Sequence, residues 1–287
     1  MKNILLCTDG SAYAENVYRY GAWFASQFHA KINVLFVTDI RSQKVVSTGN
    51  LSGSIGLGAS EQLLNELVNL EHEKAKLNNQ RAKLILQNAA ATLKAEGIED
   101  FKLTNKTGFL VDCFHEFAEN HDLIVLGKRG EAADFASGHL GANLDRIIRS
   151  SSKPCLVTPR EFKIIDRILV TYDASLTGKK ILEFLVDYPV FQSLEVHLLT
   201  VAKSNSDQTA STRLNEAKQL LQKARFEPIC SLLEGEPEKA IARYVQENKI
   251  NLLMMGAYGH SRIRHLIIGS TTTQILRSSN IPVLVFR

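Results

Sequence analysis

The segment Asn251-Leu-Leu-Met-Met-Gly-Ala-Tyr-Gly259, followed after nine residues by Gly269-Ser270, predicts both the fold and the main candidate site. Residues 251–255 form a short apolar run typical of a buried strand, and residues 270–277 follow the last glycine as a helical segment. Glycines let backbone N–H groups approach a ligand where a Cβ atom would block them. A helix start adds unpaired donors and a positive dipole end. The segment therefore predicts an anion-binding turn between a strand and a helix.

The spacing of these glycines differs from two common phosphate motifs. It is neither the G-x-G-x-x-G of dinucleotide-binding folds nor the G-x-x-x-x-G-K-[ST] of P-loops. It matches G-x-x-G-x9-G-[ST], and the strand-like run Asn280-Ile-Pro-Val-Leu-Val-Phe286 follows it. With that context, the pattern resembles the ATP-binding signature of the universal stress protein family. Two glycines after a strand are by themselves equally typical of a tight turn.

A second copy of this strand, glycine turn and helix pattern lies upstream, which indicates an internal duplication. Three pairs of segments share their pattern: 4–11 with 168–175, 122–130 with 251–259, and 153–157 with 281–285. The resemblance therefore covers nearly the whole chain. It predicts an N-terminal domain over residues 1–160 and a C-terminal domain over residues 161–287.

Composition bounds the class of protein. The 287 residues, 45% hydrophobic and 22% charged, suit two globular domains better than a single core. Because no apolar run approaches about 18 residues and the first residues do not form a signal peptide, we expect no membrane partner and a cytoplasmic location. A net charge of +4 without a long basic run argues against nucleic acid as a partner. The four cysteines lack metal-ligand spacing and are predicted to be reduced and structural: Cys7, Cys113, Cys155 and Cys230.

Apolar strands alternate with amphipathic helices, which predicts an α/β fold. We expect two tandem five-stranded, mainly parallel open sheets flanked by helices, similar to Rossmann folds and to the adenine-nucleotide alpha-hydrolase fold. The strands expected in the C-terminal half are 168–172, 195–201, 227–232, 252–255 and 283–286. Ser211 is expected to cap one helix, and Pro237 is expected to begin another.

The N-terminal half carries an insertion, residues 41–74, with no counterpart downstream. Residues 47–58 are too rich in glycine and serine to hold a regular element. A long helix is predicted after this loop, because apolar residues recur at helical spacing at Leu70, Leu77, Leu84 and Ala91. This helix is expected to end near Gly97. The insertion is interpreted either as a flexible lid or partner-binding arm, or as a solvated segment without a role, because loop insertions cost little stability.

Candidate binding residues gather at the expected carboxyl ends of the C-terminal strands, where open sheets bind ligands. Asp173 could accept hydrogen bonds from a ribose or support a metal, and it is equally suited to cap the next helix. The family resemblance implies contacts to the adenosine part of ATP from Thr171, Val201 and Met255. It implies a position around the phosphates for Gly256, Gly259, Gly269, Ser270 and Thr271. ATP could be bound with or without Mg²⁺.

The roles of Ser270 and of the loop before it are left open by the sequence. A hydroxyl at residue 270 could cap the helix, face a bound anion, or do both. Arg262 and Arg264, with no acid beside them, favour phosphate, although such clusters are also typical of a solvated face. His260 has no visible carboxylate partner or nucleophile and is not assigned as a general base.

The N-terminal copy departs from the motif in three ways. Ten residues separate Gly130 from Gly141, and Ala142 stands where the other copy has a serine. The charges of Lys128 and Arg129 are offset by Glu131 and Asp134. Since a lost hydrogen bond to a charged group costs about 1.5–3 kcal/mol, this half is predicted to bind ATP poorly or not at all. Asp9 is then interpreted as a helix cap.

The last strand of each half, 154–157 and 282–285, would be an exposed edge in an isolated domain. The family resemblance implies dimerisation through this region, and a tandem chain could instead pair its two halves internally. Whether two chains also form a homodimer stays open.

The sequence is therefore interpreted as a tandem universal stress protein that binds ATP in its C-terminal domain. It would act as a nucleotide-responsive stress regulator with at most slow hydrolysis, since no triad, carboxylate pair or P-loop lysine is visible. One alternative is a scaffold with a vestigial site, in which the 41–74 insertion contacts a partner. The other is an adenylyl- or phosphoryl-transferring enzyme.

Overall fold

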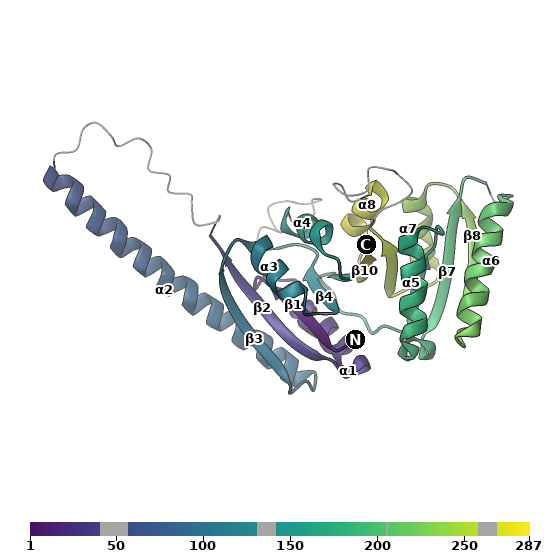
Figure 1. The fold of residues 1–287 in the computed structure, drawn as a ribbon, viewed down its shortest axis with the longest axis horizontal. Helices are drawn as coiled ribbons and strands as arrows, with labels where there is room; N and C mark the ends of the chain where they lie inside the picture. The colour runs from purple at the N-terminus through teal and green to yellow at the C-terminus, as the bar shows by residue number, and fades with distance from the viewer. Residues whose placement is uncertain (41–56, 131–141, 205, 258–268) are drawn as a thin grey trace.

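The computed structural model describes residues 1–40, 57–130, 142–204, 206–257 and 269–287, in which strands and helices alternate along the chain (Figure 1). The N-terminal half contains β1 (Asn3–Thr8), α1 (Ala14–Phe28), β2 (Lys31–Asp39), α2 (Leu57–Ala95), β3 (Phe101–Gly108), α3 (Leu110–Ala118), β4 (Leu123–Gly127), α4 (Ala142–Ser150) and β5 (Cys155–Thr158). The C-terminal half contains β6 (Arg167–Thr171), α5 (Leu176–Asp187), the 3-10 helix η2 (Pro189–Ser193), β7 (Glu195–Ala202), α6 (Gln208–Lys223), β8 (Ile229–Glu234), α7 (Pro237–Glu247), β9 (Leu252–Gly256), α8 (Ser270–Ser278) and β10 (Val283–Phe286). The predicted α/β class is confirmed.

The described strands form one sheet in the order β3-β2-β1-β4-β5-β10-β9-β6-β7-β8. The five strands of the N-terminal half pair in parallel, and so do the five of the C-terminal half. β5 and β10 meet antiparallel in the middle. Each half is therefore a five-stranded parallel sheet, and the two sheets are continuous with each other.

The β5–β10 pairing forms an apolar seam between the halves. Val283 lies opposite Val157, Leu284 opposite Leu156, and Val285 opposite Cys155. All six side chains are buried. Because each strand satisfies the backbone hydrogen-bonding groups along the other, neither half exposes this edge to solvent.

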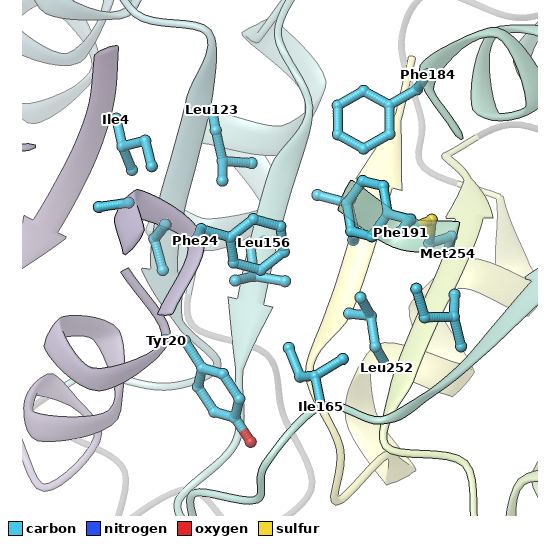
Figure 2. Close-up of a cluster of buried hydrophobic side chains, with 14 of the residues drawn as sticks. Ile4, Tyr20, Phe24, Leu123, Leu156, Ile165, Phe184, Phe191, Leu252 and Met254 are labelled. Carbon is cyan, nitrogen blue, oxygen red and sulfur yellow. The ribbon is translucent and has the colours of Figure 1, made fainter. Parts of the chain in front are cut away.

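Helices cover both faces of the sheet. The buried side chains of α1, α2, α5 and α6 belong to one core cluster, and those of α3, α4, α7 and α8 belong to the other. Figure 2 shows the first cluster continuing across the seam, from Phe24 and Leu156 to Phe191 and Leu252. The core is thus shared between the two halves. A ring contact of 5.6 Å between the centroids of Phe28 and Phe191 adds to it.

The helix starts are set by local hydrogen bonds. Asp207 caps α6, because its Oδ1 accepts the Ala210 amide at 3.0 Å. The predicted cap at Ser211 is wrong, since Ser211 lies inside the first turn and its amide bonds to the Asp207 carbonyl. Pro237 begins α7, as predicted. A proline fits there because the first helical N–H has no intrahelical acceptor.

Helix α2 corrects the prediction for the insertion. Leu57 and Gly58, predicted as the end of a loop, are the first residues of a 39-residue helix. The strong helix formers that follow them explain this extension. Residues 47–56 lie outside the described part of the chain. The stripe of Leu70, Leu77 and Leu84 is exposed, whereas the helix packs on the core through Ala82, Leu86, Ala89 and Leu93.

The four cysteines form no disulfide in the structure. Cys113 and Cys155 are buried. Burial raises the pKa of Cys155 to about 12, so its thiol stays protonated near neutral pH. A separate finding concerns membranes: in the described ranges, no helix has the length and apolarity needed to cross one.

We expect Leu284→Ala to lower the free energy of unfolding by about 2–5 kcal/mol, because it leaves a cavity at the fully buried seam. Denaturant unfolding followed by circular dichroism measures this change. Leu176→Ala, at a residue that is 72% exposed on α5, is the control and should change stability by less than about 0.5 kcal/mol. Equal stability of the two variants would contradict the buried seam.

Candidate functional site

The strand order creates a switch point between β6 and β9. The chain leaves β6 towards β7 on one side, whereas it leaves β9 towards β10 on the other. Because the two connections diverge, the carboxyl ends of these adjacent strands form a topological switch point. Open α/β sheets bind their ligands at such positions.

Three of the predicted residues lie on neighbouring strands at this edge. Thr171 ends β6, and its Oγ1 donates to the Met254 carbonyl at 3.4 Å. Met255 is buried near the end of β9, and Val201 is half-buried near the end of β7. Met255 and Val201 pack with the core beneath α7 and α8, and the alternation of strand side chains places Thr171 on that same face. The structure therefore brings these three residues together.

Hydrogen bonds tie the end of β9 to the start of α8 and to the end of β10. The Thr272 hydroxyl donates to the Gly256 carbonyl at 2.9 Å. The Gly269 amide donates to the Ala257 carbonyl at 3.0 Å, and the Ala257 amide donates to the Phe286 carbonyl at 2.7 Å. Gly256, Gly269 and the first turn of α8 consequently lie beside one another. Thr272 was missed in the sequence, where the run of three threonines was its only signal.

Helix α8 begins at Ser270, as predicted, with Gly269 as its N-cap residue. No side chain among the described residues caps it, so the predicted capping role of Ser270 is wrong. A glycine has no side chain to offer, and the Ser270 side chain is exposed. The first amides of a helix have no intrahelical acceptor and lie at the positive end of the dipole. This helix start therefore has the donors that an anion requires.

Asp173 is exposed directly after β6. Its Oδ1 accepts the Ser175 amide at 2.9 Å, which closes a local Asx turn. Ser175 is the N-cap of α5, because its Oγ accepts the Gly178 amide at 3.1 Å. The helix-cap interpretation of Asp173 is thus wrong, and the carboxylate lies at the switch point beside Thr171.

Asp9 repeats this local geometry in the N-terminal half. Its Oδ1 accepts the Ser11 amide at 2.9 Å, and helix α1 begins only at Ala14. The N-cap of α1 is Tyr13, which makes no side-chain cap bond. The helix-cap interpretation of Asp9 is therefore also wrong, because the carboxylate is engaged in the turn before the helix.

The residue after each aspartate has a left-handed backbone. Gly10 has a φ of 77°, and Ala174 has a φ of 60°. Glycine adopts this conformation without cost, whereas a residue with a Cβ atom is strained there. The C-terminal half therefore holds strain next to Asp173 that the N-terminal half avoids. The alignment of Ala174 with Gly10 was the signal for it in the sequence.

The N-terminal counterpart of the site is built differently. Lys128 is buried, and its Nζ donates to the Ser279 carbonyl of the other half at 2.8 Å. Burial and the neighbouring Arg129 guanidinium lower the pKa of Lys128 to about 8. A Cβ atom built on Gly130 would lie 2.7 Å from Asp9 Oδ2, so a carboxylate adjoins this glycine. The lysine therefore contacts the seam, and an acidic group lies beside the glycine turn.

Several predicted residues lie outside the described ranges. They are Gly259, His260, Arg262 and Arg264 in the C-terminal half, and Glu131, Asp134 and Gly141 in the N-terminal half. Thr271 is described, in the first turn of α8. Within the described part of the chain, no cluster of three or more His, Cys, Asp or Glu is arranged to hold a metal ion.

The comparisons with known proteins agree with one another on the family. A model of the Universal stress protein family matches residues 1–159 and 165–287. A curated relative, Universal stress protein Slr1230 of Synechocystis sp., is 56% identical over 287 residues, and the match covers 100% of both chains.

Solved structures show the same fold. A universal stress protein from Archaeoglobus fulgidus DSM 4304 has a TM-score of 0.71 at 23% identity, covering 99% of this chain and 96% of that chain. At 23% identity, this similarity indicates a shared fold and nothing about function. A shorter structure, a universal stress protein from Archaeoglobus fulgidus in complex with dAMP, covers 44% of this chain and 100% of that chain at 19% identity. Its TM-score is 0.36.

We expect Ala174→Gly to raise the free energy of unfolding by about 1 kcal/mol, because it relieves left-handed strain that exceeds the added flexibility of the unfolded chain. The matched reverse change, Gly10→Ala, should lower the free energy of unfolding by more than Ala174→Gly raises it. Its Cβ atom would lie 2.6 Å from Ile85 Cδ1 in addition to the strain. Denaturant unfolding of both variants tests the pair, and a loss of stability in Ala174→Gly would contradict the strain.

Lys128 should make stability depend on alkaline pH. Its pKa is about 8 in the folded protein and 10.5 when unperturbed, so the unfolded chain binds more protons between these values. Stability therefore gains a rising contribution from pH 8 to about 10.5, amounting to about 2 kcal/mol. Relative to the wild type, Lys128→Met should lower the change in unfolding free energy between pH 7 and pH 10 by about this amount. Lys179→Met, at an exposed position on α5, should leave that change as in the wild type.

Proposed function

Because this chain belongs to the universal stress protein family, we propose that its C-terminal half binds ATP, with or without Mg²⁺, and that it acts as a nucleotide-responsive stress regulator with at most slow hydrolysis. The observation that carries the proposal is the start of α8, which has no side-chain cap in the described residues and adjoins the switch point. Such an arrangement favours an anionic ligand over a neutral one.

The phosphates of ATP would lie at the first turn of α8. The amides of Ser270 and Thr271 and the exposed Ser270 hydroxyl are the donors there. Gly256 and Gly269 adjoin them without side chains that would block the approach. The Thr272 hydroxyl holds the Gly256 carbonyl at 2.9 Å, which keeps that carbonyl away from an anion. In the same proposal, Gly259 and Arg262 contribute further phosphate contacts.

The adenosine part would lie at the carboxyl ends of β6, β7 and β9. Val201 and Met255 offer apolar surface, and Thr171 offers a hydroxyl on the same face of the sheet. The exposed Asp173 carboxylate lies two residues beyond Thr171, the last residue of β6, and could accept hydrogen bonds from the ribose. One nucleotide would thus span from the strand ends to the helix start.

We propose one nucleotide per chain. In the N-terminal half, Lys128 contacts the Ser279 carbonyl, and the Asp9 carboxylate adjoins Gly130. The α4 helix begins with Ala142, which has no hydroxyl to offer. A negative group beside the glycine and the missing hydroxyl both disfavour a triphosphate there.

A binding role is favoured over catalysis by the groups at the switch point. Asp173, Thr171 and Ser270 can bind and orient a nucleotide. Phosphoryl transfer also requires groups that neutralise developing charge and position a nucleophile. The sequence has no P-loop lysine, and the described residues around the switch point provide no base paired with a nucleophile. A scaffold with a vestigial site and a transferring enzyme remain the two alternatives that the experiment separates.

Ser270→Ala should weaken ATP binding by about 10- to 100-fold, because it removes a hydrogen bond to a charged group. Isothermal titration calorimetry with ATP, in the presence and absence of Mg²⁺, measures the dissociation constant of the protein for ATP. The melting temperature without ligand should be unchanged, since this side chain makes no cap bond in the structure. Asp9→Asn is the matched control in the N-terminal half and should leave ATP affinity as in the wild type.

The outcomes distinguish the alternatives. Purified protein that releases adenine nucleotide on heating, without turnover of added ATP, supports a binding protein. Absence of binding at millimolar ATP with Mg²⁺ would overturn the proposal and favour the alternative of a scaffold protein with a vestigial site. Multiple turnover that Ser270→Ala reduces would instead identify a transferring or hydrolysing enzyme.

A further inference from the structure

Helix α2 is much longer than its counterpart in the other half. Both α2 and α6 connect the second and third strands of their halves, but α2 has 39 residues and α6 has 16. The difference of 23 residues (39 − 16) corresponds to about 35 Å of helix. Figure 1 shows the N-terminal part of α2 extending well beyond the sheet. The extra length therefore forms an arm on the body of the protein.

The two parts of α2 differ in burial. The C-terminal part is held on the core by Ala82, Leu86, Ala89 and Leu93. Where the helix leaves the body, the guanidinium of Arg81 donates to the Asp9 carbonyl at 3.3 Å. From residue 65 to residue 81 no side chain is buried. We call residues 65–84 the arm; Ala82 is the one residue within it that is buried against the core.

Leucines recur on one side of the arm. Leu70, Leu77 and Leu84 are 60%, 65% and 67% exposed, and they are spaced by seven residues. Leu63 continues the same spacing in the sequence. Single exposed leucines are ordinary on a protein surface, but leucine at every seventh residue along one side of a helix supplies one of the two apolar heptad positions through which helices pair. The row lies on a different side of the helix from the residues that pack on the core.

The charges of the arm change sign at its centre. Residues 65–73 contain Glu66, Glu71 and Glu73 and no lysine or arginine, for a formal charge of −3. Residues 74–84 carry a formal charge of +4 and no acid; the basic residues are Lys74, Lys76, Arg81 and Lys83. A second copy of the arm is complementary to the first only when it runs in the opposite direction. A parallel copy would place acid beside acid and base beside base.

We propose that the arm is a dimerisation element that pairs antiparallel with the arm of a second copy of this chain. A two-fold axis between residues 73 and 74 places Leu70 of each chain opposite Leu77 of the other. The same axis places the acidic part of each arm along the basic part of the other. The contact is self-complementary, as a two-fold dimer requires. The interface is small, so a dissociation constant on the order of micromolar is expected.

The first experiment measures the mass of the full chain by sedimentation equilibrium between about 1 and 100 μM. The 31.9 kDa chain should shift from monomer to dimer over this range. The double change Leu70→Gln and Leu77→Gln should weaken the dimer at least about tenfold, because it removes the leucine row. Glutamine is a good helix former and adds no charge, so circular dichroism should be unchanged. Leu220→Gln, at a leucine 42% exposed on the counterpart helix α6, should not affect the mass.

The second experiment tests the charges. Changing Glu66, Glu71 and Glu73 to lysine should weaken the dimer at least about tenfold, and changing Lys74, Lys76 and Lys83 to glutamate should do the same. Combining both sets in one chain reverses the sign of every charge in the arm except that of Arg81, which donates to the Asp9 carbonyl, and should restore the dimer. Failure of this restoration would contradict charge complementarity as the basis of pairing.

Disulfide cross-linking tests the direction of pairing. Lys74→Cys lies next to the proposed axis and should cross-link two chains under mild oxidation. Leu67→Cys has the same heptad position, but in the antiparallel pair it lies opposite residue 80, about 20 Å from its symmetry mate, and should not cross-link. Wild-type protein, with its four native cysteines, is the blank. A monomer at 100 μM, a dimer insensitive to the leucine changes, or cross-linking through Leu67→Cys alone would overturn the proposal.

Discussion

The antiparallel pairing of β5 with β10 is the constraint on which the rest of the structure depends. Each half folds as a parallel sheet that would otherwise end in an open, apolar edge. By pairing these edges, the chain forms one ten-stranded sheet and extends the core cluster from Phe24 across to Phe191 and Leu252. The seam also orients the two strand-end regions on one scaffold, and it takes Lys128 out of solvent by placing it against Ser279.

Duplication has produced two switch points with the same topology and different chemistry. In both halves an aspartate follows the first strand and closes a turn two residues later. The residue after the aspartate is Ala174 in the C-terminal half, where the left-handed backbone is strained, and Gly10 in the N-terminal half, where it is not. The helix after the glycine turn begins with Ser270 in the C-terminal half and with Ala142 in the N-terminal half. The two switch points therefore share their turn geometry but differ in the residues that line them.

Part of the candidate site could be predicted from local pattern. The run of apolar residues before Gly256 and the helix start at Ser270 follow from hydrophobic periodicity and glycine placement, and both are where the pattern indicates. The capping roles of Asp9, Asp173, Ser211 and Ser270 were wrong. A cap depends on which of several adjacent polar groups reaches a free amide, and the local turn decides that over distances of a few ångströms.

The sequence by itself determined the α/β class, the duplication and the order of the strands and helices, because hydrophobic period and turn residues act within short stretches of chain. Only the tertiary structure decided that β5 lies against β10, that Lys128 contacts Ser279, and that the leucines of α2 are exposed while Ala82 and Leu86 are buried. These depend on contacts between residues far apart in the chain. No local pattern encodes which distant surface a strand edge or helix face will meet.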